Sequence, residues 1–443
     1  MTDMTNDGIK LDASNPQGLL DYIQRLKEEN ARLESSSRLG LNFENTPDEN
    51  VVRYSTRVPL SVHESGNDVM TDDNGITHDL IIGDNYPGLL TLLPKYEGRI
   101  NVIYIDPPYN TGNNDFIYND RYTNPEDSYK HSKWLSFMEP RLRLAKRLLS
   151  DDGAIFVSID DHEQSRLKLL MDGIFGERNS MGVVTVVNNL KGRSDSRYFA
   201  TAHEYLIGYA AGPEFVLKGF PISERMRSEY KHEDEKGRYK LIPLKKTGSD
   251  SLREDSPSLY YPIYYNPTNG TIGITGDADS VEILPTIKGV DGRWRWSRSK
   301  VVNEASELEV MRTHDVYQIF TKMRLDVHGR ERTTSAKTVW LDRRYDTGSG
   351  GRMIGSILGD NRAFSSPKPL EYIKDILRIS SNGDSIILDF FAGSGTTGQA
   401  VTELNAEDGG HRHCILITDE GRSVDDPNAV NIARDITYTR LQR

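Results

Sequence analysis

Two apolar runs, each ending abruptly in a polar turn, constrain the fold of this chain more than any other sequence feature. The first is INVIYIDPPYNTG at 100–112, and the second is SIILDFFAGSGTTGQAV at 385–401. Short apolar runs that end in polar turns are typical of buried parallel strands. The sequence therefore predicts an α/β fold built on a largely parallel sheet.

The segments around these runs alternate between strand and helix patterns. Further strands are predicted at DLIIGD, AIFVSID, VVTVV, EYLIGYA and CILITDE. Apolar residues at helical spacing predict helices in the leucine-rich stretch after Gly83, at 134–149, near 167–171 and at 370–379. The alternation of predicted strands and helices stops near residue 212 and resumes after residue 365. An insert is therefore expected between two halves of one core.

Changes in composition and in the alternation of strand and helix patterns divide the chain into four segments. Residues 1–76 carry an amphipathic pattern, at 16–35, and then a polar arm that is expected to be irregular. The core is predicted at 77–212 and 353–443, and the charged, aromatic segment 213–352 is predicted to be an inserted α+β domain. The amphipathic helix suits either a dimer contact or packing on its own chain.

Composition excludes several classes of protein. The mean hydropathy is -0.59, and neither an apolar run of about 18 residues nor a basic-then-apolar amino terminus is present. We therefore expect a soluble, cytoplasmic protein. Cys414 is the only cysteine, which excludes a disulfide framework and a cysteine-based zinc site, and no metal ion is expected.

The net charge of -11 conceals an uneven distribution along the chain. Residues 1–100 carry 9 Lys and Arg against 17 Asp and Glu, whereas residues 286–352 carry 14 against 9. Net charge averages over surfaces that a ligand never meets. A polyanionic ligand is therefore expected to bind the later segment.

The second apolar run leads into a turn with the spacing Gly-x-Gly-x-x-Gly, at Gly393, Gly395 and Gly398. Glycines let a ligand approach the backbone closely, and free amides at a helix start favour a polar or anionic group. The next strand ends in Asp419 and Glu420, and a carboxylate at that place suits a ribose. The pattern predicts a nucleotide-like cofactor, and taken alone it leaves a dinucleotide site open.

The first apolar run ends in a carboxylate, two prolines and an aromatic ring, from Asp106 to Tyr109. Successive prolines cannot extend a central strand, so this loop is rigid for a reason other than packing. A loop of this kind suits chemistry on an amine that is conjugated to a purine ring. Such an amine is a poor nucleophile unless hydrogen-bond acceptors pull its hydrogens out of the ring plane. Asp106 and the Pro107 carbonyl offer such acceptors, and Tyr109 offers a ring on which an extruded base can stack.

Several segments together resemble the amino-methyltransferases of DNA in their permuted β-class arrangement, in which DPPY precedes FxGxG. The similarity is greatest to modification subunits of type III restriction systems and extends from about residue 79 to the end of the chain. The segments that carry it are IIGDNYPGLLTLL, INVIYIDPPYNTGNNDFIYND, WLSFMEPRLRLAKRLLSDDGAIFVSIDDHE, HEYLIGYA, GRWRWS, FSSPKPLEYIKDIL and DFFAGSGTT.

The resemblance implies a Rossmann-like S-adenosylmethionine-dependent methyltransferase sheet with an inserted target-recognition domain. It implies site-specific transfer of a methyl group from S-adenosyl-L-methionine to the exocyclic amine of adenine flipped out of duplex DNA. A homodimer is the family expectation, and a restriction subunit or other defence-system partner is possible. Asp before Pro-Pro-Tyr resembles adenine-N6 enzymes more than cytosine-N4 enzymes, although it does not exclude cytosine.

The same resemblance implies roles for individual residues. The catalytic loop is Asp106, Pro107, Pro108 and Tyr109. Asp389 is expected near the methionine amino group of the cofactor, and Glu420, or alternatively Asp419, at the ribose. The residues expected to bind the cofactor are Asp84, Asn110, Phe364, Lys368, Pro369, Asp389, Phe391, Ala392, Gly393, Gly395, Thr396 and Glu420.

Basic residues beside aromatic ones suggest where DNA is contacted. GRWRWSRSK combines phosphate-seeking charge with the rings of Trp294 and Trp296, and the loop NNLKGRSDSRY lies between two predicted strands. Each of these cations is equally suited to a solvated surface. The candidate DNA contacts are Lys191, Arg193, Arg293, Arg295, Arg298 and Lys300.

Two other functions compete with this interpretation. An inactive binding subunit that keeps the cofactor fold is disfavoured by the intact DPPY and FAGSG motifs. Methylation of RNA or of protein glutamine is more typical of Asn-Pro-Pro-Tyr and of another motif order.

Overall fold

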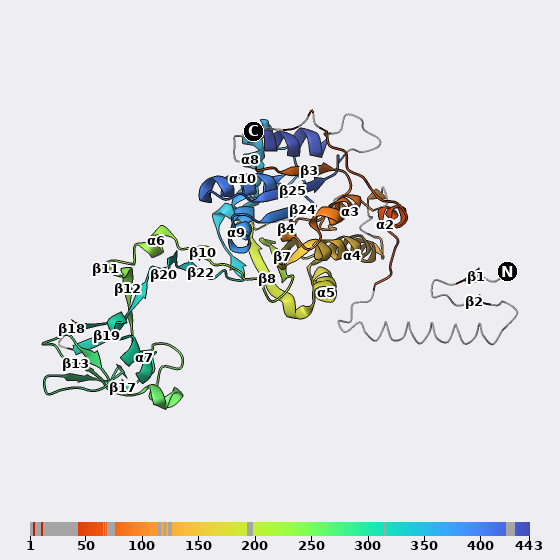
Figure 1. Ribbon diagram of the computed structural model, residues 1–443. Helices are drawn as coiled ribbons and strands as arrows, with labels where there is room; N and C mark the ends of the chain where they lie inside the picture. Colours follow the sequence, from red (N-terminus) through yellow and green to blue (C-terminus); the bar gives the residue numbers. More distant parts are fainter. Residues whose placement is uncertain are drawn as a thin grey trace. The chain divides into compact units, whose positions relative to one another are not determined.

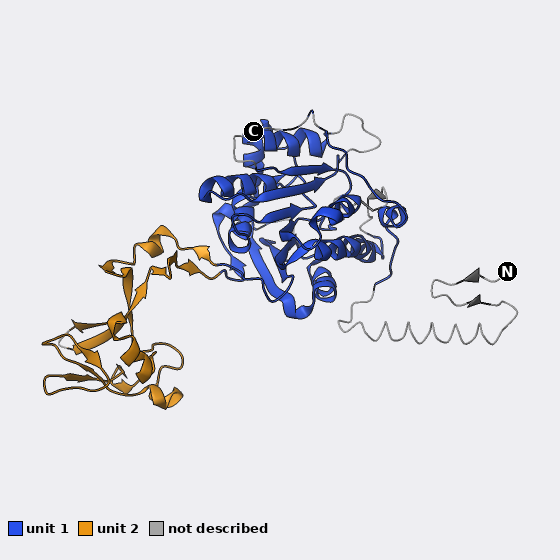
Figure 2. Cartoon of the chain, viewed as in Figure 1, with its two compact units in different colours: residues 1–218, 336–443 blue, residues 219–335 orange. Residues whose placement is uncertain are grey.

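The computed structural model of the chain contains two compact units, Met1–Lys218 with Ala336–Arg443, and Gly219–Ser335 (Figures 1 and 2). The helix predicted at 16–35 lies outside the described residues. Apart from four two-residue strands (β1, Asp3–Met4; β2, Lys10–Leu11; β5, Ile117–Tyr118; β6, Arg121–Tyr122), the structure describes residues 43–64, 66, 68, 76–112, 126–192, 198–313, 316–421 and 430–443.

An eight-stranded sheet forms the centre of the first unit and confirms the predicted α/β fold. Strand β9 runs antiparallel to both of its neighbours, and every other pair in this sheet is parallel. The order is β23 (Val339–Trp340), β8 (Ser180–Val187), β9 (His203–Ala210), β7 (Leu149–Ile159), β4 (Ile100–Ile105), β24 (Ile386–Asp389), β25 (His413–Thr418) and β3 (Asp79–Ile82).

The sheet order brings the two sequence motifs together. Strand β24 pairs with β4, with Leu388 opposite Ile103, although the two strands are far apart in the sequence. Because the strands are parallel, the DPPY loop after β4 and the glycine turn after β24 leave the same edge of the sheet. Ligands in open α/β sheets bind at this edge, outside the carboxyl ends of the strands.

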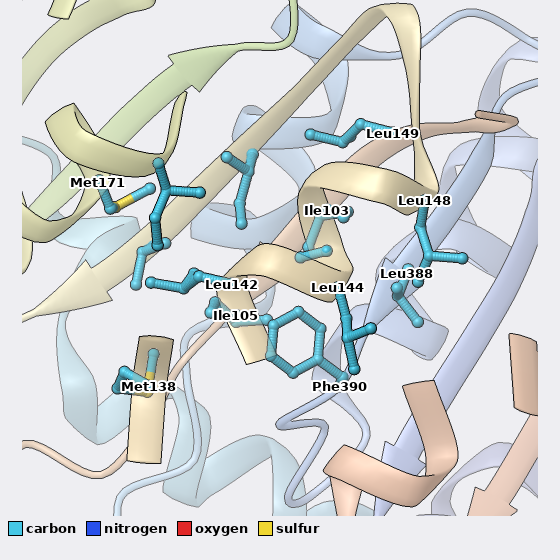
Figure 3. Close-up of a cluster of buried hydrophobic side chains, with 14 of the residues drawn as sticks. Ile103, Ile105, Met138, Leu142, Leu144, Leu148, Leu149, Met171, Leu388 and Phe390 are labelled. Atoms are coloured by element: carbon cyan, nitrogen blue, oxygen red, sulfur yellow. The ribbon is translucent and has the colours of Figure 1, made fainter. Parts of the chain in front are cut away.

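Helices pack on the sheet and close its core. Side chains of α4, including Met138, Leu142 and Leu148, lie against Ile103 and Leu388 of the central strands, and all five are fully buried (Figure 3). Burying one such side chain stabilises the fold by about 1.5–3 kcal/mol. The principal helices are α3 (Asn85–Tyr96), α4 (Lys130–Leu148), α5 (Gln164–Phe175), α8 (Thr347–Leu358), α9 (Leu370–Ser380) and α10 (Thr396–Asp408).

The arm before the sheet is more regular than its composition predicts. A short helix, α2 (Glu49–Tyr54), begins at Asp48, whose side chain accepts from the backbone amides of Asn50 and Val51. The buried Arg141 donates to Asp48 at 2.9 Å and so ties this helix to α4. Among the residues that the structure describes, no helix is both long and apolar enough to cross a membrane.

The second unit is shorter than the predicted insert 213–352. Residues 336–352 belong to the first unit, because β23 pairs with β8 and because Gly350 of α8 lies against the Pro367 carbonyl. A Cβ at Gly350 would lie 2.0 Å from that oxygen. The second unit contains a four-stranded antiparallel sheet of β11 (His232–Asp234), β12 (Gly237–Pro243), β19 (Val316–Arg324) and β18 (Leu308–Thr313), and the short helix α7 (Arg298–Asn303).

Candidate active site

A cleft opens at the carboxyl edge of the sheet, beside the ends of β4 and β24. Its cavity volume is about 80 Å³, smaller than the ~300–1,000 Å³ of typical small-molecule sites. Both motifs contribute to its walls. The lining residues are Tyr104, Asp106, Phe364, Ser366, Lys368, Asp389, Phe391, Ala392, Gly393, Ser394, Thr396 and Thr397.

Four polar side chains meet at the DPPY loop. The Tyr109 hydroxyl lies 2.9 Å from Asp106 Oδ1 and 3.1 Å from Glu204 Oε2. Lys368 Nζ lies 2.5 Å from the Tyr109 hydroxyl, 2.6 Å from Glu204 Oε2 and 3.3 Å from Asp106 Oδ1. Among the described residues, none donates to Asp106 Oδ2 or to the Pro107 carbonyl. Two acceptors of the loop are therefore available to a substrate.

Burial and charge set the protonation of this cluster. Burial raises the pKa of the Asp106 carboxyl above its ordinary value, although the Lys368 ammonium opposes the rise. Burial also works against the charge of Lys368, but the carboxylates of Asp106 and Glu204 outweigh it and raise the lysine pKa. The site thus combines a charged lysine with an aspartate that is more basic than usual.

The DPPY loop is held by buried polar contacts. The Trp134 indole donates to the Pro108 carbonyl at 2.7 Å. Asn110 is buried, with a left-handed φ of 58° that asparagine tolerates better than most residues. Its amide donates to Glu163 Oε1 at 2.6 Å, and His131 Nδ1 lies 2.5 Å from the same oxygen. Asn110 therefore serves the shape of the loop, and it is absent from the cleft lining.

The glycine turn has no room for a Cβ atom at Gly393 or Gly395 without close contacts. Gly393 and Gly395 have φ of 48° and 75°, in the left-handed region that favours glycine. A Cβ at Gly393 would lie 3.1 Å from Phe364 Cζ, and one at Gly395 would lie 2.9 Å from Thr437 Cγ2. Both glycines are therefore required by the backbone conformation and by the packing of the turn, and Gly393 also lines the cleft.

The buried Arg440 supports this turn. Arg440 is 3% exposed, and its Nη1 lies 3.1 Å from Ser394 Oγ and 2.8 Å from Thr396 Oγ1. Burial lowers its pKa to about 10. Its Nη2 is buried without a hydrogen-bond partner among the described residues. Arg440 therefore fixes the two hydroxyl residues that flank Gly395.

Asp389 lies at the floor of the cleft. It is 3% exposed and accepts from the Phe391 amide at 3.0 Å and from the Thr397 hydroxyl at 2.6 Å. Burial raises its pKa to about 7 despite these two donors. A cation bound beside Asp389 would favour the charged carboxylate.

Four other predicted cofactor residues lie outside the cleft lining. Asp84 caps helix α3 by accepting from the Tyr86 amide, and Arg141 Nη2 lies 3.4 Å from it. Glu420 follows β25, is 42% exposed, and has Arg434 Nε at 3.6 Å. The remaining two are Pro369, which precedes α9, and Gly395.

The predicted DNA contacts fall in both units and are described for each unit alone. In the first unit Lys191 is exposed, and Arg193 lies outside the described residues. In the second unit Arg295, Arg298 and Lys300 are exposed and Arg293 is half-buried. Trp294 is not the surface ring that the motif suggested, because it is 2% exposed and its indole donates to the Tyr261 carbonyl at 2.7 Å.

Six residues of the site were not among the predicted site residues: Tyr104, Glu204, Ser366, Ser394, Thr397 and Arg440. Glu204 is a polar residue near the start of an apolar strand, and only the antiparallel placement of β9 beside β7 brings it to the DPPY loop. Thr397 was detectable, because it directly follows the predicted Thr396 at the start of a helix.

Comparisons with known proteins agree with this geometry. A family model described as DNA methylase matches residues 100–422. The EcoPI Mod subunit of a type III restriction-modification enzyme, from Escherichia phage P1, is 35% identical over 407 residues, which cover 84% of this chain and 62% of that protein. The type II methyltransferase M.KpnI, from Klebsiella pneumoniae, is 37% identical over 341 residues, which cover 76% of this chain and 79% of that protein.

A third relative is the StyLTI Mod subunit of a type III restriction-modification enzyme from Salmonella typhimurium. It is 32% identical over 372 residues, which cover 78% of this chain and 53% of that protein. The matches thus span between about half and four fifths of these three relatives. The family match includes both the DPPY loop and the glycine turn, and the chain belongs to the N6/N4 family of DNA methylases.

Proposed function

We propose that the chain is a site-specific DNA methyltransferase that acts on the N6 amine of adenine, with S-adenosyl-L-methionine as methyl donor. The observation that carries this proposal is the pairing of β4 with β24. That pairing sets the acceptors of the DPPY loop beside a cleft built on a glycine turn. Family membership and the Mod-subunit relatives support it.

Asp106 and Pro107 prepare the amine for attack. Asp106 Oδ2 and the Pro107 carbonyl each accept one amine hydrogen, which draws the nitrogen lone pair out of conjugation with the ring. The raised pKa of Asp106 suits it to take the proton that the methylated amine releases. Lys368 keeps Asp106 and Glu204 from repelling each other and holds Tyr109 until a base arrives to stack on its ring.

The cleft holds the methyl donor. S-adenosylmethionine bound there would supply an activated methyl group, whose carbon would bond to the amine nitrogen as the carbon–sulfur bond breaks and its electron pair goes to sulfur. Asp389 would bind the cationic amino group of the methionine moiety, Phe364 and Phe391 would pack on the adenosine, and the Gly393 backbone would face the ligand without a side chain. Glu420 would bind the ribose after turning from Arg434.

Duplex DNA is the proposed substrate, and Gly219–Ser335 is the proposed target-recognition domain. Its exposed cations on and beside α7, Arg295, Arg298 and Lys300, suit contacts with phosphate. By analogy with the relatives named Mod subunits, we further propose a role in a restriction-modification or related defence system in the cytoplasm. That role includes a homodimer and a possible restriction partner.

Product analysis tests this function. The purified chain is incubated with S-adenosylmethionine that carries a labelled methyl group and with unmethylated plasmid DNA, and the DNA is digested to nucleosides. Label in N6-methyladenine is expected. Label in N4-methylcytosine would reassign the base, and label in no nucleoside from any DNA would contradict the proposal.

A further inference from the structure

The connection between β8 and β9 begins and ends at the catalytic edge of the sheet. The Asn188 and Asn189 amides both donate to the Ala202 carbonyl, at 3.1 and 3.2 Å, and the Thr347 amide donates to the Asn188 carbonyl at 3.0 Å. Two residues after Ala202, Glu204 touches the Tyr109 hydroxyl. The described ends of this connection are therefore fixed beside the DPPY loop.

Phe199 is unusually exposed for a large apolar side chain. It is 90% exposed, and its neighbour Tyr198 is 80% exposed. Lys191, in the same connection, is exposed as well. Full solvation of an aromatic ring is unfavourable, and aromatic side chains with cations beside them are suited to stacking on nucleic-acid bases. This chemistry distinguishes the connection from an ordinary polar loop.

We propose that Phe199 enters the duplex beside the target base pair and stacks in the gap that the flipped adenine leaves. This inference rests on the proposed function. The amine of a stacked adenine cannot reach the Asp106 and Pro107 acceptors, so the base must leave the helix, at a cost in stacking and pairing. A ring inserted into the gap restores part of the stacking and thereby favours the flipped state.

The reach of the chain permits this insertion. Phe199 is five residues before Glu204, and an extended chain rises about 3.4 Å per residue, so the two Cα atoms lie within roughly 17 Å of each other. Duplex DNA is favoured over a second protein surface because the exposed ring and Lys191 lie on a connection that starts at the catalytic edge.

The test compares Phe199→Ala and Phe199→Trp with wild type and with Val216→Ala. Val216 is a matched control, because it is 76% exposed and follows β9 at the opposite edge of the sheet. Plasmid DNA modified by the wild type is first sequenced to locate the methylated adenines. Single-turnover methylation is then measured on a duplex with that site, and on the same duplex with an abasic residue opposite the target adenine.

Phe199→Ala is expected to slow methylation of the intact duplex by about tenfold to a hundredfold, the loss typical of one base–aromatic stack. The abasic duplex, in which the target adenine is already unpaired, should recover most of that rate, and Phe199→Trp and Val216→Ala should stay near wild type. A structural defect would slow both duplexes equally. The fluorescence of 2-aminopurine at the target position should rise less with Phe199→Ala than with wild type.

Three results would overturn the inference while leaving the proposed function standing. One is wild-type methylation of the intact duplex by Phe199→Ala. A second is an equal loss on the intact and abasic duplexes. The third is a change in oligomeric mass without DNA, which would assign the ring to a contact between copies of the chain. Failure of the wild type to methylate any duplex would instead refute the proposed function.

Discussion

Glu204 and Lys368 link the charges of the candidate active site at the scale of single residues. Burial raises the pKa of Asp106, and the Glu204 carboxylate adds to this rise. Lys368 lies 2.6 Å from Glu204 and 3.3 Å from Asp106. In Glu204→Gln, Asp106 would be the one remaining carboxylate of the pair that contacts Lys368. We predict that this change lowers the pKa of Asp106 and makes its carboxylate a weaker proton acceptor. The acidic limb of the pH profile for methyl transfer should move to lower pH, and kcat should fall by roughly tenfold, as for the removal of a charged hydrogen bond.

The matched control for Glu204 is Glu214→Gln. Glu214 is exposed and lies after β9, at the edge of the sheet opposite the catalytic loop. Its pH profile should coincide with that of the wild type. An unshifted acidic limb in Glu204→Gln would show that Glu204 does not influence the protonation of Asp106.

Asp389 predicts a pH dependence of cofactor binding. Its pKa is raised to about 7 by burial, so its carboxyl is neutral below that pH and charged above it. Because the methionine ammonium would need the charged form, affinity for S-adenosylmethionine should rise as pH increases toward 7 and then level off. Below pH 7 it should fall by about tenfold per pH unit. Calorimetry from pH 5.5 to 8.5, at approximately half-unit steps, checks this slope.

Asp389→Asn is the control for that titration. It is nearly isosteric and cannot ionise, so its affinity should be weaker and should not vary over the same pH range. A wild-type affinity that is flat across pH 7 would contradict the placement of a cation beside Asp389.

The residues that could be predicted from sequence are those whose function depends on their immediate neighbours in the chain. Asp106 to Tyr109 and the glycine turn at Gly393 and Gly395 are local patterns, and one residue of each, Asp106 and Gly393, lines the same cleft. Glu204 and Arg440 reach the site only through pairing and packing of distant segments. A single sequence does not specify such contacts, so these two residues were missed.

At the scale of whole elements, the N-cap of helix α2 is held to the core by a buried cation. Arg141 is fully buried, contacts Asp48 at 2.9 Å and Asp84 at 3.4 Å, and lies 3.7 Å from the centre of the Phe137 ring. Arg141→Ala would leave the buried Asp48 carboxylate without its partner. We predict a loss of about 3–5 kcal/mol in the free energy of unfolding, measured by urea denaturation.

Arg143→Ala provides the comparison on the same helix. Arg143 is 60% exposed and pairs with Glu139 at 2.6 Å on the solvent face. Its removal should change the free energy of unfolding by no more than about 0.5 kcal/mol, because exposed ion pairs contribute little. Equal effects of the two substitutions would exclude Arg141 as the anchor of the arm.

Elements were predictable where apolar periodicity is strong, and less so at polar boundaries. Strands β4 and β25 and helix α9 match the predicted runs closely, whereas β7 begins at Leu149, five residues before the predicted run AIFVSID. Helix α2 was missed because its sequence is polar, and its packing depends on Asp48 meeting Arg141. The end of the insert was placed too late because residues 336–352 are charged, yet they rejoin the core through β23 and α8.

At the scale of the whole molecule, we predict that Gly219–Ser335 supplies much of the affinity for DNA. Changing Arg295, Arg298 and Lys300 together to Ala should weaken DNA binding and reduce the slope of log affinity against log salt by up to about 3, one for each phosphate that is no longer neutralised. Affinity for S-adenosylmethionine should stay unchanged. Fluorescence anisotropy at several salt concentrations measures the slope, and an unchanged slope would place the DNA-binding surface elsewhere.

The strand order is a whole-molecule feature that could be predicted only by combining the periodicity of the strands with the order of the two motifs. Periodicity predicts strands at 100–105 and 386–389, but it does not say that they are neighbours. The permuted order of DPPY before the glycine turn, through its resemblance to a known arrangement, predicted one sheet. The pairing of Ile387 with Val102 is the structural form of that prediction.

The central claim is that the DPPY loop performs chemistry on a methyl donor held separately at the glycine turn. Single-turnover methyl transfer by Asp106→Asn, with cofactor affinity measured on the same preparation, tests it most directly. We predict a fall of about a hundredfold or more in the transfer rate, as for the loss of a group that acts on the transition state. Affinity for S-adenosylmethionine should change little. Transfer at the wild-type rate, or equal loss of transfer and cofactor binding, would contradict the claim.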